Sequence, residues 1–242
     1  KRMKERCFCN EGPVLCFGDS LTEGYHGVWA HPYLGPRRVD GAEAEDLRLL
    51  PYAHELGRLL ATDAMEPFVY VGVASRYAEC RAYSGWTAKE LAPRLEAALR
   101  GGPWRCVAVL AGSNDVVAHG VCAEEALRRV VRLWALCDAV GVPVLVVTNP
   151  DCDTSHHGLV PPDEACGRRF QLARLAQLVG AAARSQGRVV VDGRAAVPMP
   201  TSGEEGREKN NSYLWDDSMH FSPAGVAALG KAVHTAVKSA GL

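Results

Sequence analysis

The chain has 242 residues, 48% of them hydrophobic and 23% charged, a composition that excludes disordered and collagen-like proteins and is typical of globular ones. Its 27 Lys and Arg balance 28 Asp and Glu, so the formal charge of −1 provides no overall field for attracting nucleic acid or an anionic membrane. No apolar run approaches the roughly 20 residues that cross a bilayer. We therefore expect neither a nucleic-acid partner nor an integral membrane segment.

The length fits one α/β domain over residues 1–242, with residues 1–12 as an N-terminal extension. The first residues are basic but lead into no apolar segment, so no secretory signal is visible. The nine cysteines are an odd number and lack the CxxC spacing of a zinc site. These features favour a cytoplasmic over a secreted protein with reduced cysteines, a disulfide between Cys152 and Cys166 being the alternative.

From Pro13 onward, short apolar runs alternate with segments of helical period, the pattern of a parallel sheet wrapped by helices. The predicted strands are Val14–Phe17, Phe68–Val73, Cys106–Leu110, Val144–Thr148 and Val189–Val191. The predicted helices are Thr87–Arg100, Glu124–Val140, one from about Asp163 to Ser185, and one from Ser222-Pro223 to about Lys238. This order predicts a three-layer α/β/α sandwich with a five-stranded parallel sheet. Two long loops, Gly24–Leu49 and Ala195–Asp216, are of a length that is usually functional.

The first candidate for chemistry is Ser20, in the segment Gly18-Asp19-Ser20-Leu21 directly after the first predicted strand. Ligands of open α/β sheets bind outside the carboxyl ends of the strands, and a glycine permits the sharp turn that exposes a side chain there. Ser20 is therefore a candidate nucleophile. The alternative is a serine that only caps the following helix.

A serine nucleophile needs a base, and histidine has the suitable pKa. Of the eight histidines, His220 is distinguished by Asp217 three residues before it, in a loop just ahead of the last predicted helix. A carboxylate so placed can hold one ring nitrogen and turn the other toward the serine. Asp216 could take the same role, and a solvated loop with a helix-capping carboxylate is the alternative for the whole motif.

Donors for a developing negative charge follow two other elements. Asn114 lies in Gly112-Ser113-Asn114-Asp115, directly after strand Cys106–Leu110, and Gly85 lies in Ser84-Gly85-Trp86-Thr87, ahead of a predicted helix. A side-chain amide and a backbone N–H at these places can stabilise an oxyanion. The alternatives are an ordinary turn for the first segment and helix capping for the second.

Together these segments resemble, in sequence and order, the four conserved blocks of the SGNH (GDSL-like) hydrolase family, over about Val14 to Gly230. The resemblance implies the flavodoxin-like fold of that family. It also implies that Ser20 is the nucleophile, that Asp217 and His220 complete the catalytic triad, and that Ser20, Gly85 and Asn114 form the oxyanion hole. No metal or organic cofactor is implied.

Four further residues are predicted to line the substrate cleft. Asp19 and Trp86 adjoin Ser20 and Gly85, and Asp151 and His156 belong to a polar loop at the carboxyl end of the fourth predicted strand. Asp151 and His156 belong to Asp151–His157, a segment rich in metal-ligand types, so a metal-dependent hydrolase is a competing reading of that segment.

The function expected from the resemblance is hydrolysis of carboxylic esters through an acyl-enzyme. The substrate would be a small-molecule ester: a small acyl ester, a lysophospholipid or an acetylated carbohydrate. Acyl transfer to another alcohol by the same groups is one alternative. A catalytically silent ligand-binding module that keeps the fold is another.

Overall fold

The structure is a computed structural model of the chain. It describes residues 12–26, 30–31, 35–36, 48–49, 51–71, 74–152, 162–199, 214–216 and 219–242. The site residues Asp217 and His156 therefore lie outside the described residues, as does most of the two predicted long loops.

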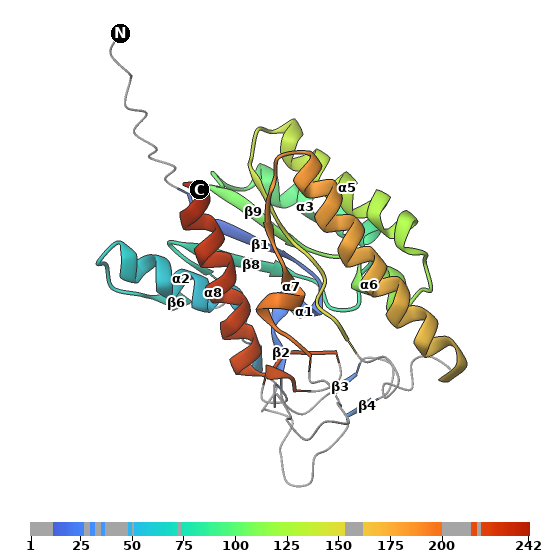
Figure 1. The fold of residues 1–242 in the computed structure, drawn as a ribbon. Helices are drawn as coiled ribbons and strands as arrows, with labels where there is room; N and C mark the ends of the chain where they lie inside the picture. Colours follow the sequence, from blue (N-terminus) through green and yellow to red (C-terminus); the bar gives the residue numbers. More distant parts are fainter. Residues whose placement is uncertain are drawn as a thin grey trace.

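A seven-stranded sheet forms the centre of the molecule, in the order β11-β10-β9-β1-β8-β7-β6 (Figure 1). Its strands are β1 (Val14–Gly18), β6 (Tyr70–Val71), β7 (Ala74–Ser75), β8 (Ala78–Ala82), β9 (Cys106–Leu110), β10 (Val144–Val147) and β11 (Val189–Val191). The pairs from β11 to β8 are parallel, whereas β7 and β6 are added antiparallel at one edge. Since β1 lies near the middle, its carboxyl end is flanked by the ends of β8 and β9.

Helices cover both faces of the sheet (Figure 1). They are α1 (Ser20–Glu23), α2 (Tyr52–Asp63), α3 (Ala88–Arg100), α4 (Ser113–Val117), α5 (Ala123–Ala139), α6 (Pro162–Ser185), α7 (Gly193–Ala196) and α8 (Pro223–Ala240). Helices α3, α5 and α6 pack on one face, and α2 and α8 on the other. The predicted α/β class with three layers is confirmed, and the four predicted helices are present as α3, α5, α6 and α8.

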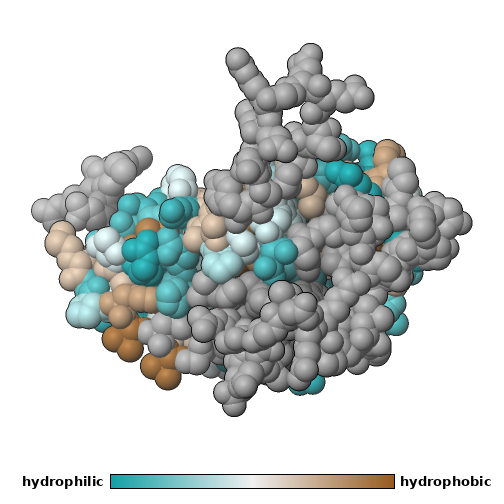
Figure 2. Space-filling view, turned by 90° about the horizontal axis from the view of Figure 1, so that it is seen from below, coloured by the Kyte–Doolittle hydropathy of each residue, from teal (hydrophilic) through white to brown (hydrophobic). Residues whose placement is uncertain are grey.

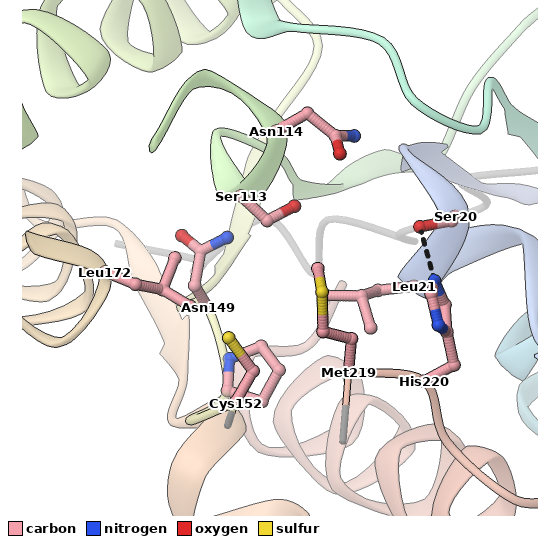
Figure 3. Close-up of a pocket in the computed structure, with 10 residues that line it drawn as sticks. Ser20, Leu21, Ser113, Asn114, Asn149, Cys152, Leu172, Met219 and His220 are labelled. Carbon is pink, nitrogen blue, oxygen red and sulfur yellow. Dashed lines mark hydrogen bonds between the residues drawn. The ribbon is translucent and has the colours of Figure 1, made fainter. Parts of the chain in front are cut away.

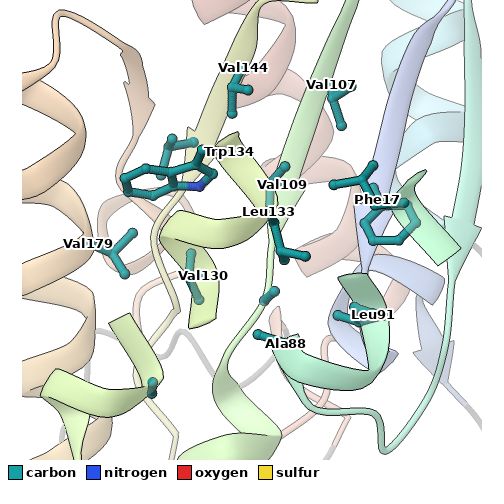
Figure 4. Packing of buried hydrophobic residues seen from close by; sticks show 14 of the residues in the cluster. Phe17, Ala88, Leu91, Val107, Val109, Val130, Leu133, Trp134, Val144 and Val179 are labelled. Carbon is teal, nitrogen blue, oxygen red and sulfur yellow. The ribbon is translucent and has the colours of Figure 1, made fainter. Parts of the chain in front are cut away.

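Two hydrophobic cores result, one on each face of the sheet. Figure 4 shows the first, where Phe17, Val109 and Val144 of the sheet meet Leu91 of α3 and Trp134 of α5. Strand side chains alternate between faces, so consecutive residues of β1 supply both cores. This explains why β1, β9 and β10 read as continuous apolar runs.

The predicted strand Phe68–Val73 is present only as the short edge strand β6, and strand β8, which pairs with β1, was not predicted. The strand beside β1 is β8, whose residues alternate between buried Ala78 and Cys80 and half-buried Glu79 and Arg81. The apolar run contains only the two-residue strand β6 at the sheet edge, where Val71 is 74% exposed. The sheet is therefore mixed, with five parallel strands and two antiparallel ones.

Helix α2 was not predicted, although Tyr52, Leu56 and Leu60 are buried at a spacing of four residues. It packs against α8, where Gly230 allows close approach: a Cβ there would lie 3.0 Å from the carbonyl oxygen of Tyr52. In the stretch predicted as the loop Gly24–Leu49, the described residues form two short antiparallel pairs, β2 (Tyr25–His26) with β5 (Arg48–Leu49) and β3 (Ala30–His31) with β4 (Gly35–Pro36).

Among the described cysteines, Cys16, Cys80, Cys106 and Cys137 are buried free thiols, as the apolar surroundings of Cys106 and Cys137 indicated. The side chain of Cys166 lies outside the described residues. No helix in the described part of the chain is both long and apolar enough to cross a membrane. Seen from below, the described surface is largely hydrophilic, with a few hydrophobic residues at the margin on the side of α2 and β6 (Figure 2).

Candidate active site

The nucleophile candidate Ser20 is the first residue of α1, immediately beyond β1. The turn is tight: a Cβ on Gly18 would lie 2.0 Å from the carbonyl oxygen of Leu110 in β9, so only glycine fits. The helix is capped by Asp19, whose side chain accepts a hydrogen bond from the Leu21 N–H at 3.1 Å. Ser20 is thus not the capping residue, and its hydroxyl is left to face the pocket.

His220 is held by a short loop between two paired backbone segments. Trp215 and Phe221 form a β-bridge, the Asp216 N–H donates to the His220 carbonyl at 2.9 Å, and the Ser222 N–H donates to Leu214. The rings of Trp215 and Phe221 meet edge to face, and Ser222 caps α8. These contacts fix the backbone on either side of His220.

The two candidates meet although 200 residues separate them: His220 Nε2 lies 3.2 Å from Ser20 Oγ (Figure 3). Both are nearly buried, with 5% and 7% of their surface exposed. This is the distance at which a histidine can take a proton from a hydroxyl. Asp216 is exposed, and Asp217, the carboxylate predicted to orient the ring, lies outside the described residues.

The turn that carries Gly85 lies beside the Ser20 turn, because the Tyr83 N–H donates to the Gly18 carbonyl at 2.9 Å. Gly85 has a φ of 78°, as the third position of a type II turn requires. Asn114 lies in α4, and its Nδ2 donates to the Trp86 carbonyl at 3.1 Å. This bond fixes the amide of Asn114 with its nitrogen toward the turn.

Asp115 of α4 connects the Gly85 segment to helices α3 and α5. It is fully buried and accepts from the Ala88 N–H at 2.7 Å and from Arg129 of α5 at 2.9 Å. The first bond satisfies the start of α3, whose N-cap is Thr87 with a capping box to Glu90. Helix capping, the alternative considered for this segment, therefore exists alongside the Gly85 turn.

Asp19 joins the nucleophile turn to α4, because the Ser113 hydroxyl donates to its second carboxylate oxygen. The carboxyl is fully buried. Burial raises the pKa of Asp19 to about 6, although the hydrogen bonds from Ser113 and from the Leu21 N–H lower it. Between its unfolded and its folded pKa, this carboxyl is therefore protonated in the folded protein and ionised in the unfolded chain.

Replacing Asp19 with asparagine is expected to change how stability depends on pH. Because the folded pKa is raised, the native state binds more protons than the unfolded state from about pH 4 to about pH 6, so the contribution of Asp19 to stability falls as the pH rises. Urea denaturation should show the free energy of unfolding of the wild type falling relative to Asp19→Asn by roughly 2 to 3 kcal/mol from pH 4 to pH 7. A constant difference would mean that the buried carboxyl keeps an ordinary pKa.

Two residues predicted for the cleft have other contacts. The ring of Trp86 stacks on Tyr83 at 4.9 Å between centroids and lies under Arg94. Asp151 forms ion pairs with Arg194 at 2.9 Å and with Arg169 at 3.8 Å. Neither Trp86 nor Asp151 is among the described residues that line the pocket at Ser20. Within the described ranges, no three His, Cys, Asp or Glu side chains gather as metal ligands would.

A small pocket that opens to solvent lies at Ser20. Its described lining is Ser20, Leu21, Ser113, Asn114, Asn149, Pro150, Cys152, Leu172, Met219 and His220 (Figure 3). Asn149, Cys152, Leu172 and Met219 were not among the predicted site residues. For Asn149 a signal existed, since it directly follows the predicted strand Val144–Thr148, at the carboxyl edge of the sheet.

Residues 16–228 of the chain match the sequence model of the GDSL-like lipase/acylhydrolase family. No curated protein matches the chain in sequence. Several solved structures are similar in fold. A carbohydrate acetylesterase family member from Sinorhizobium meliloti is 22% identical with a TM-score of 0.65, the match covering 96% of this chain and 100% of that one.

A GDSL-like lipase from Bacteroides thetaiotaomicron is 15% identical with a TM-score of 0.64, the match covering 95% of this chain and 89% of that one. An aryl esterase from M. smegmatis is 19% identical with a TM-score of 0.61, covering 94% and 99%. At such identities the likeness is one of fold.

Proposed function

The chain belongs to the GDSL-like lipase/acylhydrolase family, and from this premise we propose that it hydrolyses small carboxylic esters by a serine mechanism with Ser20 as nucleophile. The observation that carries the proposal is the 3.2 Å distance between Ser20 Oγ and His220 Nε2 inside one pocket. A histidine this close serves as the general base that a serine hydroxyl needs.

In the proposed reaction, His220 takes the proton of Ser20 as its oxygen attacks the ester carbonyl, and then gives it to the leaving alcohol. The negative oxygen of the tetrahedral intermediate is stabilised by the N–H groups of Ser20 and Gly85 and by the amide of Asn114. Water, activated by the same histidine, then hydrolyses the acyl-enzyme. Asp217, by the resemblance in motif, orients His220.

The dimensions of the pocket favour a short acyl group. The pocket is small and opens to solvent, and its described apolar lining includes Leu172, Met219 and Cys152. A long acyl chain would need a longer apolar groove than these residues provide. We therefore propose acetyl or butyryl esters, including acetylated carbohydrates, as substrates ahead of a lysophospholipid.

The test is hydrolysis of p-nitrophenyl acetate, butyrate and octanoate, together with intact-mass analysis after a fluorophosphonate probe. The wild type should turn over the short esters faster than the octanoate and carry one adduct. Ser20→Ala should lose both turnover and adduct, because the probe reacts with an activated serine. Ser185→Ala is the matched control, because Ser185 is exposed at the end of α6.

The outcomes separate the alternatives. A wild type with neither turnover nor adduct would indicate a non-catalytic binding module. An adduct that persists in Ser20→Ala would place the nucleophile elsewhere. New ester products on addition of acceptor alcohols would indicate an acyltransferase that uses the same residues.

A further inference from the structure

Asn149 is a polar residue of the pocket for which the proposed mechanism has no use. It lies two residues after the end of β10, is fully buried, and lines the same pocket as Ser20 and His220. In Figure 3 its amide points to the side of the pocket on which Ser113 lies, across from Ser20. It is thus part of the wall of the site.

Neither the amide oxygen nor the amide nitrogen of Asn149 has a hydrogen-bond partner among the described residues. The other amide of the pocket differs, because Asn114 donates to Trp86. Buried polar groups in native proteins almost always have a partner, and an exception calls for an explanation such as a bound molecule. Asn149 therefore points to a ligand that supplies both a donor and an acceptor.

The backbone holds this side chain in place. The Thr148 N–H donates to Val191 at 3.0 Å, and the Thr148 hydroxyl accepts from the Gly193 N–H at 3.0 Å, which ties the end of β10 to β11 and α7. Pro150 follows, and a residue before proline is restricted to extended backbone. Asn149 is therefore presented on a rigid strand end, as a recognition residue needs to be.

The position of Asn149 indicates which part of a substrate it meets. The strand order places β10 two strands from β1, at roughly 10 Å by the usual strand spacing. The tetrahedral carbon carries Ser20 Oγ, an oxyanion toward Asn114 and a leaving oxygen toward His220. The remaining substituent is the carbon chain of the acyl group, for which the pocket wall at Asn149 is left.

From these observations we propose that Asn149 selects esters whose short acyl group carries a hydroxyl. This hydroxyl would accept a hydrogen bond from Asn149 Nδ2 and donate one to Asn149 Oδ1. The inference rests on the proposed function. A hydroxyl fits because it combines a donor and an acceptor in one small group. Met219, which lines the pocket beside these residues, is a flexible side chain that a substrate can displace.

The test compares methyl butyrate with the two enantiomers of methyl 3-hydroxybutyrate, by titrating the released acid with the wild type, Asn149→Leu and the control Ser185→Ala. The wild type should favour one hydroxy ester by about tenfold in kcat/KM, as one buried hydrogen-bonded group supports. In Asn149→Leu, which has the same number of side-chain heavy atoms but no polar ones, the ratio should fall to about one. Ser185→Ala should keep the ratio of the wild type.

A second readout does not depend on turnover. Replacing an unpartnered buried amide with an apolar side chain should raise the midpoint of thermal unfolding by about 2–4 °C, in Asn149→Leu or in the smaller Asn149→Val, which avoids overpacking. A fall of the midpoint in both variants would show that the amide has a structural partner and would overturn the inference.

A failure of the proposed function and a failure of the proposal on Asn149 give different results. If the wild type hydrolyses no ester, the proposed function is wrong. If it hydrolyses methyl butyrate and the ratio is the same in Asn149→Leu, the serine mechanism stands and Asn149 binds at most an ordered water, so the hydroxyl selectivity is wrong.

Discussion

Replacing His220 with alanine is expected to lower kcat/KM for p-nitrophenyl acetate by about four to six orders of magnitude, the range found when the base of a serine hydrolase is removed. The imidazole lies 3.2 Å from Ser20 Oγ, so its loss leaves the hydroxyl protonated and the leaving alcohol without an acid. The adduct with a fluorophosphonate should form correspondingly slowly. Both kcat/KM and the rate of adduct formation should fall because the same general base is missing.

The matched control is His234→Ala. His234 lies on α8, where its ring nitrogen meets Asp63 at 2.7 Å, remote from the pocket lining. This variant should keep the activity of the wild type. Because His220 is buried, His220→Gln is the companion variant that retains a polar side chain. If His220→Ala kept within tenfold of the wild-type rate, the assignment of the base would be wrong.

Replacing Asn114 with alanine is expected to lower kcat by about 10²–10³ with little change in KM, because an oxyanion donor acts mainly in the transition state. The bond from Nδ2 to Trp86 fixes the amide, and its second hydrogen is the one proposed to meet the oxyanion. Asn114→Asp keeps the shape and replaces that donor with a negative charge, so it should be at least as inactive as alanine.

Steady-state kinetics on p-nitrophenyl butyrate check this, with unfolding midpoints measured in parallel. Gln186→Ala, which removes an exposed amide beyond the end of α6, is the control. A rise in KM with unchanged kcat in Asn114→Ala would assign Asn114 to ground-state binding instead. Equal activity of Asn114→Asp and the wild type would exclude an oxyanion contact.

Much of the fold was predictable because the central strands of a parallel sheet are buried on both faces. Strands β1, β9 and β10 have to be apolar throughout, and the helices that cover them carry a stripe of leucines. Strand β8 was not predicted, because it is not apolar throughout. Its polar residues Glu79 and Arg81 alternate with buried ones, and its place beside β1 is decided by pairing across the sheet.

By itself the sequence determined the catalytic candidates, because Ser20 and Asn114 follow apolar strands and the carboxyl ends of parallel strands meet at one edge. The tertiary structure alone decided the rest. It brought His220 to 3.2 Å from Ser20, buried Asp19 against Ser113, and left the amide of Asn149 unpartnered among the described residues. These contacts join residues that are far apart in the sequence. Local periodicity and motif spacing carry no information about which distant segments meet at the pocket.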